Sequence, residues 1–515
     1  MFETELKFQV PAPRWAALHK AVATTTAVKT RLQAMYVETP GHDLAAAGLA
    51  LRLRKEGRVW VQTLKGRGDG LMQRLEHEVR LPPLPARSGL PQVDPARHDG
   101  TPAGQALQRV LAAAREAGRS DTLQVLYRTD IQRLHRRVRH GGAVVEIALD
   151  QGAIHAGADT AAPLMLPVAE IEFELISGPP QALAALAARW AARFDLWWDV
   201  RTKSERGFRL ALGLARVPAT RAQPQVLPAG GLAPALASML QAALAQALPN
   251  LAELAGAPAD TPAAPEHLHQ LRVALRRLRT ALVLLGDWAP EPAAALTLET
   301  RWREVFNALG AARDADVLAS TWMPRLQAAG APALSGPPAQ NAGDVTALLR
   351  EHRVTVLLLD TLAFSLDLSQ PAAPPAPGAE TPEAAPGPAS ARAVLRRAWR
   401  RAWADARKFD EAPVEQQHRA RKRLKRLRYV LEFLTPWLPA RSLRRYQRAL
   451  RRALEALGEH NDLQTARAHF AGQTPTDPQA WFAVGWLAAQ DGPSRERAVQ
   501  ALARLKARKR PWLKR

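Results

Sequence analysis

A chain of 515 residues is too long for one hydrophobic core, and its 47% hydrophobic and 23% charged residues are typical of a globular protein, so we expect at least two domains. The formal net charge of +23 favours polyanionic partners such as nucleic acid, polyphosphate or an anionic membrane surface. The absence of cysteine excludes disulfides, thiolate metal sites and cysteine nucleophiles. No apolar run could span a bilayer and no signal-like start is present, which predicts a soluble cytoplasmic protein without a membrane partner.

The first ten residues, MFETELKFQV, alternate charged and apolar side chains. Glu3, Glu5 and Lys7 therefore share one face at period two, which is typical of a β-strand. A solvated edge strand would show the same pattern. Two carboxylates on one strand face can also hold a divalent cation through oxygen ligands, and the lysine could neutralise a phosphate.

Several further segments before residue 212 repeat this alternation. Their charged faces carry Arg52 and Arg54, Lys65, then Arg74, Glu76, Glu78 and Arg80, then Glu146 and Asp150, and finally Glu170, Glu172 and Glu174. So many charged faces predict a shared polar interior, which a closed antiparallel barrel would provide if helices covered its apolar outer face. Residues 12–25, 103–118 and 180–194 are the candidate covering helices.

Such an interior would bury many charges. Leaving one of them unpaired costs several kcal/mol. We therefore expect bound cations to neutralise the glutamates and a bound polyanion to neutralise the arginines and lysines. A metal-bound oligophosphate would do both.

The second half of the chain follows a predicted linker at residues 213–230, which contains most of the Pro- and Gly-rich stretch RVPATRAQPQVLPAGG (216–231). Ala, Leu and Arg then recur at helical spacing. A flexible Pro-rich insertion is predicted at residues 370–390, and the basic end ARLKARKRPWLKR is interpreted as a solvated or frayed tail.

The helical half contains an internal repeat. HLHQLRVALRRLRTALVLL (267–285) aligns with QQHRARKRLKRLRYVLEFL (416–434), and LGAARDADVL (309–318) aligns with LGEHNDLQTA (457–466). Two copies at a nearly constant offset predict a duplicated helical unit, and a pseudo-twofold bundle.

Each copy places one histidine and three cations in a sector of about 80° of a helix, beside a separate apolar sector. We call these two sets the stripes; they are His269, Arg272, Arg276 and Arg279, and His418, Arg421, Lys425 and Arg428. A single stripe would be an ordinary solvated helix face, but the duplication favours anion binding, and two facing stripes would make a groove for a long polyanion. His267 is interpreted as structural. His267 and His269 would make a poor metal site, because positions two apart on a helix do not share a face.

The opening ETELK resembles the ExExK signature of the CYTH superfamily, the triphosphate tunnel metalloenzymes. The segments LRLR, TLKG, RLEHEV, YRTDIQR, EIALDQG, AEIEFELISG and TKSERGF follow in that family's order over residues 1–212. The resemblance implies an eight-stranded antiparallel tunnel that binds inorganic triphosphate with Mg²⁺ or Mn²⁺.

Carried over to this sequence, the resemblance implies roles for individual residues. Catalytic roles fall on Glu3, Glu5 and Lys7, metal binding on Glu3, Glu5, Glu170, Glu172 and Asp150, and phosphate binding on Lys7, Arg52, Arg54, Lys65, Arg133 and Lys203. Arg128 competes with Arg133 for one role, and Glu146 competes with Asp150 for another. The roles of Glu76 and Glu78 stay open.

The doubled pattern H-x-x-R-x-x-x-[RK]-x-x-R resembles the CHAD domain, a helical domain associated with inorganic polyphosphate binding. We expect it at residues 231–475, with a helical extension and basic tail at 476–515. A CYTH unit followed by CHAD is similar to bacterial inorganic triphosphatases, which implies hydrolysis of triphosphate to diphosphate and phosphate. Other CYTH activities, such as thiamine triphosphatase, adenylyl cyclase or RNA 5′-triphosphatase, and a non-catalytic polyphosphate- or nucleic-acid-binding protein are the alternatives. The oligomeric state stays open.

Overall fold

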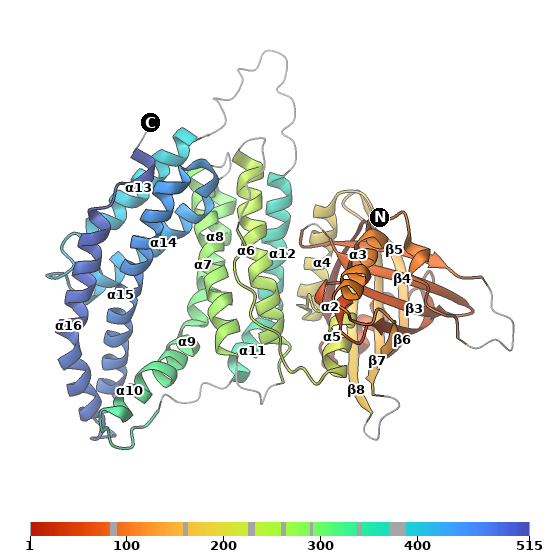
Figure 1. The fold of residues 1–515 in the computed structure, drawn as a ribbon, viewed down its shortest axis with the longest axis horizontal. Coiled ribbons are helices and arrows are strands. Elements are labelled where there is room, and N and C mark those ends of the chain that lie inside the picture. Colours follow the sequence, from red (N-terminus) through yellow and green to blue (C-terminus); the bar gives the residue numbers. More distant parts are fainter. Residues whose placement is uncertain are drawn as a thin grey trace, which may run out of the picture. The chain divides into compact units, whose positions relative to one another are not determined.

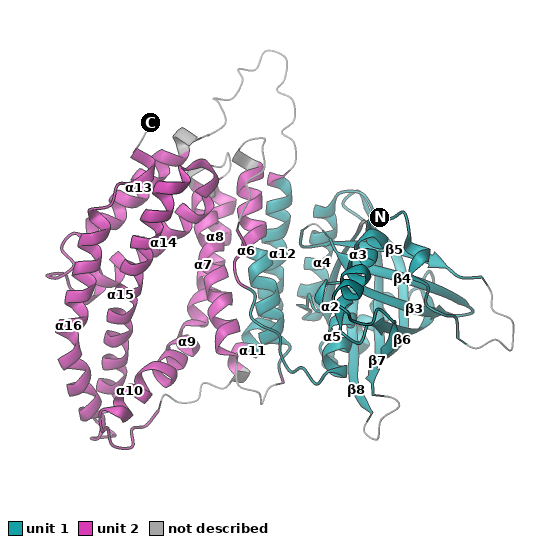
Figure 2. Ribbon diagram, in the orientation of Figure 1, with its two compact units in different colours: residues 1–220, 244–257, 346–367 teal, residues 221–243, 258–345, 368–515 magenta. Residues whose placement is uncertain are grey.

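The computed structural model describes residues 2–68, 70–82, 90–157, 163–224, 232–258, 264–288, 292–336, 342–369 and 388–513. The chain forms two compact units (Figure 2): unit 1 contains residues 1–220, 244–257 and 346–367, and unit 2 contains residues 221–243, 258–345 and 368–515. The predicted Pro-rich insertion lies outside the described residues up to residue 387, and the end of the predicted linker lies outside them from residue 225. In the described parts of the chain, no helix is both long enough and apolar enough to cross a bilayer.

Eight antiparallel strands of unit 1 close into a barrel (Figure 1). They are β1 (Phe2–Gln9), β2 (Val28–Glu38), β3 (Ala50–Glu56), β4 (Val59–Arg67), β5 (Gln73–Arg80), β6 (Gln124–His140), β7 (Ala143–Ala156) and β8 (Leu164–Ser177). The order around the sheet is β5-β4-β3-β2-β6-β7-β8-β1, and pairing of β1 with β5, where Glu3 faces Arg74, closes the ring. The short strand β9 (Trp197–Trp198) also pairs with β1. The predicted eight-stranded barrel is confirmed.

Helices cover the apolar outer face of this barrel. They are α1 (Trp15–Val22), α2 (Asp43–Ala46), α3 (Pro102–Glu116) and α4 (Pro180–Phe194). Leu107 and Leu111 of α3 pack on Leu51 and Leu64 of the strands, and Trp190 of α4 contacts Phe173 edge-on. Full burial of each such side chain is worth about 1.5–3 kcal/mol, so these contacts fix which face of every strand points inward.

Helix α5 (Lys203–Ala211) closes one end of the barrel interior. Its Phe208 packs against an apolar cluster contributed by inward-facing positions, among them Leu32, Tyr36, Tyr127, Ile131, Ile154 and Val168. The hydroxyl of Tyr127 donates a hydrogen bond to the carbonyl of Ser204 at 2.9 Å. Among the described residues, the part of the interior next to Phe208 is therefore apolar, which the charged patterning of the strands did not predict.

The second half is helical, as predicted (Figure 1). Its helices are α6 (Leu232–Ala255), α7 (Pro265–Trp288), α8 (Pro292–Ala308), α9 (Gly310–Val317), α10 (Met323–Ala328), α11 (Ala342–Arg350), α12 (His352–Leu368), α13 (Pro388–Ala406), α14 (Val414–Phe433), α15 (Ala440–Gln473) and α16 (Ala480–Lys506). The repeat occupies α7 with α9 in its first copy and α14 with α15 in its second.

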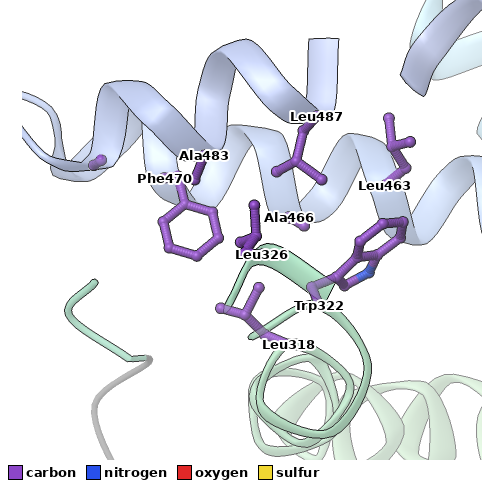
Figure 3. Close-up of a cluster of buried hydrophobic side chains, with 9 residues drawn as sticks. Leu318, Trp322, Leu326, Leu463, Ala466, Phe470, Ala483 and Leu487 are labelled. Carbon is purple, nitrogen blue, oxygen red and sulfur yellow. The ribbon is translucent and has the colours of Figure 1, made fainter. Parts of the chain in front are cut away.

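A buried cluster holds the region around α10 to the last two helices (Figure 3). Leu318, Trp322 and Leu326 pack against Leu463, Ala466 and Phe470 of α15 and against Ala483 and Leu487 of α16. The chain after α16 is packed as well, because Trp512 is 1% exposed and its ring lies 5.0 Å from that of Tyr446. The interpretation of this tail as frayed is therefore wrong as far as residue 513; residues 514 and 515 lie outside the described residues.

Candidate active site and polyanion site

Three carboxylates form the densest acidic group of the barrel interior. Asp150 on β7 lies opposite Glu170 on β8, and Glu172 follows on the same face two residues later. One carboxylate oxygen from each lies within 4.8 Å of the others, and Asp150 and Glu170 are fully buried. Such a group of hard oxygen donors suits Mg²⁺ or Mn²⁺.

Two predicted phosphate-binding residues, Lys203 and Arg133, form ion pairs with these three carboxylates. The ammonium of Lys203 is 2.7 Å from Asp150 and 2.7 Å from Glu172, and Arg133 holds both oxygens of Asp150 at 2.7 Å. Burial opposes the ionisation of Glu172, but Lys203 and Arg133 outweigh burial and hold the pKa of this carboxyl well below its usual value. Glu172 is therefore held in its ionised form beside the other two carboxylates.

Helix α5 contributes a further cation that the sequence reasoning missed. Arg206 is 8% exposed and its guanidinium contacts Glu170. It lies three residues after Lys203, so the two side chains share one helix face, and this spacing was the signal that could have found it. Lys7 is 3.9 Å from Glu170 and donates a hydrogen bond to the carbonyl of Arg201.

Glu3 and Glu5 lie apart from the three-carboxylate group. Glu3 accepts a hydrogen bond from Lys65 at 2.6 Å, and this lysine is also 3.2 Å from Glu76. Burial raises the pKa of Glu3, but Lys65 and a hydrogen bond with Glu76 lower it to about 2. Glu5 is 3.5 Å from Arg74, and burial raises its pKa. The structure thus brings together three of the five predicted metal ligands.

Two further predicted phosphate ligands belong to β3. Arg52 donates to the hydroxyl of Tyr36 at 3.1 Å, and Arg54 lies 3.2 Å from Glu78 and also contacts Glu56.

The sequence left two pairs of residues competing for one role each: Arg128 with Arg133, and Glu146 with Asp150. The members of each pair lie in different surroundings. Arg128 is exposed and pairs in register with Met35 on the outer face, whereas Arg133 points inward. Glu146 lies 3.3 Å from His135 and outside the three-carboxylate group that contains Asp150.

Two inward carboxylates titrate near neutral pH. Burial and a hydrogen bond with Glu3 raise the pKa of Glu76 to about 8. Burial, together with the charges of Glu3 and Glu146, raises the pKa of Glu174 to about 7. These shifts could not be predicted from the sequence, because they depend on which strands bring like charges together.

The charges of the interior neutralise one another directly. Each predicted metal ligand has a cationic partner: Lys65 for Glu3, Arg74 for Glu5, and Lys203 for Asp150, Glu170 and Glu172. Ion pairs within the barrel therefore offset part of the cost of burying these carboxylates, and the neutralisation of the interior by a bound metal and polyanion stays a prediction.

In unit 2 the two stripe helices pack against each other. Arg276 of α7 donates to the hydroxyl of Tyr429 on α14 at 3.0 Å. Each stripe also faces an aspartate from the other repeated segment, 309–318 or 457–466, and the two aspartates are equivalent in the repeat. Arg421 is 3.5 Å from Asp462, and Asp314 is close enough to Arg272 for its charge to act on that arginine. His418 hydrogen-bonds Asn461, and the equivalent Arg313 acts on His269.

Burial and mutual repulsion disfavour charge within the stripes. Burial, Arg421 and Arg276 lower the pKa of Lys425 to about 6, and burial with Arg276 lowers that of Arg272 to about 10. Burial and Arg313 lower the pKa of His269 to about 4, which leaves this histidine neutral. Arg279 donates a hydrogen bond to Glu299 at 2.8 Å. His267 is buried, and its structural role stays a prediction.

Comparison with known proteins identifies both halves. An inorganic triphosphatase of Haemophilus influenzae is 29% identical over 214 residues, covering 40% of this chain and 54% of that protein, so the chain spans about half the length of this relative. Similar solved structures include the CHAD domain from the plant Ricinus communis (29% identity, TM-score 0.47, 57% of this chain and 99% of that chain) and the PH1819 protein of Pyrococcus horikoshii OT3 (17% identity, TM-score 0.26, 40% and 98%). Both TM-scores are below 0.5, so neither likeness carries weight for the fold. Family profiles match residues 1–205 and residues 238–471, and the chain therefore contains a CYTH domain followed by a CHAD domain.

Proposed function

We propose that the barrel hydrolyses inorganic triphosphate to diphosphate and phosphate with a divalent metal ion. The observation that carries this proposal is the meeting of three carboxylates, Asp150, Glu170 and Glu172, with Lys203 and Arg133 inside a closed barrel. The related inorganic triphosphatase of H. influenzae supports the choice of substrate.

Asp150, Glu170 and Glu172 would hold the metal, with Glu3 and Glu5 as further ligands nearer β5. The donor set fits, because Mg²⁺ and Mn²⁺ prefer carboxylate oxygens. When bound, such an ion polarises the phosphoryl oxygens as a Lewis acid.

The cations of the barrel would bind the phosphate chain by exchanging partners. Lys65, Arg133 and Lys203 now hold carboxylates, and a triphosphate would replace these with phosphoryl oxygens while the buried charge stays balanced. Lys7, Arg52 and Arg54 are the remaining proposed phosphate contacts. Positive charge held in place stabilises the charge that develops on the leaving diphosphate.

Water activation needs a carboxylate that can take a proton near neutral pH. Glu174 and Glu76, with pKa values of about 7 and 8, meet that condition. A carboxylate of this interior would orient the attacking water, and no covalent nucleophile is required.

Substitution of Glu5 tests the proposal. Glu5→Gln should lower metal-dependent phosphate release from triphosphate at least ~10²-fold, as does loss of a preorganised electrostatic contact elsewhere. Glu116→Gln, an exposed carboxylate on α3, is the matched control and should match wild type. Activity of Glu5→Gln within threefold of wild type would contradict its role. The same assay with thiamine triphosphate, ATP and long-chain polyphosphate distinguishes the alternative CYTH activities.

For the helical half we propose that the two stripes bind inorganic polyphosphate. The observation that supports this is the group of cations whose ionisation is disfavoured by burial and by one another, namely Arg272, Arg421 and Lys425. A polyanion laid along them would relieve that repulsion.

A paired substitution tests the stripes. Arg276→Gln with Lys425→Gln should weaken binding of long-chain polyphosphate at least tenfold relative to Arg508→Gln with Lys509→Gln, which removes the same number of basic residues from exposed positions near the end of the chain. Equal losses would show that binding follows net charge alone. Equally tight binding of duplex DNA at the same salt concentration would favour the nucleic-acid alternative.

A further inference from the structure

A small pocket on the outside of the CYTH domain is lined by arginines from two elements. Arg136 and Arg139 come from the end of β6, and Arg189 and Arg193 come from α4. The pocket has a volume of about 250 Å³ and also contains His140 and one face of α4 around Trp190. It lies outside the barrel interior, since Arg136 alternates with the inward-facing His135 and Arg137.

The pocket is positively charged without compensation. Its lining contains no acidic residue, and the sequence of α4 contains none. Within the described ranges, none of the four arginines has an ion-pair partner: Arg136 donates only to the carbonyl of Ala21, at 3.2 Å, and Arg193 lies over the ring of Phe194. The Nε of Arg136 is buried and has no hydrogen-bond partner there. In the barrel interior, by contrast, Lys65, Arg133 and Lys203 are paired with carboxylates.

The walls of the pocket are held in place. Leu186, Arg189, Trp190 and Arg193 occupy positions i, i+3, i+4 and i+7 of α4 and so share one helix face. The Trp190 ring packs 5.8 Å from Phe173 and 5.4 Å from Phe194, which fixes the surface from which the two arginines project. The helix face that carries Arg189 and Arg193 is therefore fixed before an anion binds.

We propose that this pocket binds a phosphoryl anion of about the size of inorganic diphosphate. Guanidinium groups bind phosphoryl oxygens through paired, charge-assisted hydrogen bonds, and four of them from two walls match an anion of several charges. The volume of about 250 Å³ is below the roughly 300–1,000 Å³ that is typical of sites for larger organic ligands, which favours a small inorganic anion over a nucleotide. This proposal does not rest on hydrolysis in the barrel or on polyphosphate binding by the stripes.

The test is isothermal titration of the full chain with inorganic diphosphate, at physiological ionic strength and with a metal chelator. Arg189→Gln with Arg193→Gln should weaken one binding event at least ~10-fold, the effect expected when charge-assisted hydrogen bonds are lost. Arg58→Gln with Arg109→Gln is the matched control, because it removes two exposed arginines of the same unit and leaves the pocket intact. Binding at the barrel interior and the stripes is common to all three proteins, so the difference reports the pocket.

Unchanged diphosphate binding by the pocket variant, or an equal loss in the control, overturns the proposal. Orthophosphate should bind this site more weakly because it carries less charge, and equal affinity for orthophosphate overturns the assignment to a diphosphate-sized anion. If circular dichroism shows that the double variant is misfolded, Arg139→Gln at the exposed end of β6 tests the same pocket, and unchanged binding by that variant overturns the proposal as well.

Discussion

Gly207 determines how closely α5 can approach the barrel. A Cβ at this position would lie 2.3 Å from the Tyr127 ring, which is itself buried and stacked on Tyr36 at 4.7 Å. The ring therefore has no room to move away, and α5 would have to shift together with Lys203 and Arg206. The close approach explains why a glycine lies in the middle of this short helix.

We predict that Gly207→Ala destabilises the protein by about 1–3 kcal/mol, the usual cost of overpacking, and lowers triphosphate hydrolysis. Thermal unfolding and phosphate release measure the two effects. Gly485→Ala is the control, because no atom lies within 4 Å of its added Cβ and alanine favours a helix by about 0.5–1 kcal/mol. Equal melting temperatures for the two variants would contradict the close packing of α5 against the Tyr127 ring.

Glu174 gives a pH dependence with a definite sign. Its pKa is raised to about 7, mainly by burial and also by Glu3 and Glu146, whereas an unfolded glutamate titrates near ~4.3. Between these values the unfolded chain has released the proton and the folded chain has kept it. The stability contributed by this group is therefore present below about pH 4.3 and falls as pH rises through 7.

Glu174→Gln should consequently raise the melting temperature relative to wild type at pH 8 and have little effect at pH 4.5. The gain at pH 8 is expected to be roughly 1 kcal/mol after a discount for partial exposure to solvent. Thermal unfolding in the presence of a chelator at pH 4.5, 6 and 8 measures it, with Glu116→Gln as the control. A difference that stays constant across these pH values would show that the carboxyl is not shifted.

At the scale of the element, α7 and α14 together create a lysine that is neutral at pH 7.5. Burial, Arg421 and Arg276 lower the pKa of Lys425 to about 6. A polyphosphate chain on the stripes would restore this pKa toward the usual ~10.4, so binding at pH 7.5 should take up about one proton.

Calorimetry of polyphosphate binding in two buffers with different ionisation enthalpies measures this uptake. Lys425→Gln should abolish it, whereas Arg276→Gln should weaken binding and retain a smaller uptake, because burial and Arg421 still lower the pKa of the lysine. Binding heats that do not depend on the buffer in the wild-type protein would refute the shifted lysine.

At the scale of the whole molecule, the compact unit around the barrel draws helical segments from the second half. Unit 1 includes residues 244–257 and 346–367. Arg209 of α5 is 2.6 Å from Glu253, both are buried, and Thr355 accepts a hydrogen bond from the backbone of Trp198 at 3.1 Å. A chain cut at residue 220 would lose both partners and keep every proposed group of the barrel interior.

Residues 1–220 alone should therefore hydrolyse triphosphate but unfold at a lower temperature than the full chain. Loss of a partner from a buried ion pair costs about 3–5 kcal/mol, and Glu205 compensates part of this because it also contacts Arg209. Phosphate release by the fragment and by the full chain tests the predicted activity, and thermal unfolding of both tests the predicted loss of stability. A fragment that is folded by circular dichroism and inactive would show that the helical segments take part in the chemistry.

The sequence alone determined the features that depend on local periodicity. Alternation at period two placed Glu3, Glu5 and Lys7 on one face of a strand and the apolar residues on the other, which was sufficient to predict a closed barrel with a charged interior. Helical spacing and the internal repeat likewise predicted α7 and α14 with their cationic faces.

Only the tertiary structure determined which charges meet. The pairing of β1 with β5 and the packing of α5 on the barrel are long-range contacts. The ion pairs of Lys65 with Glu3 and of Arg206 with Glu170 depend on them, and so could not be deduced from spacing within one strand. The same holds for the choice of Asp150 over Glu146 as a neighbour of Glu172, because a register between strands has no local signature. The pKa values of Lys425 and Glu174 follow for the same physical reason: they depend on burial and on like charges that the fold brings together from distant parts of the chain.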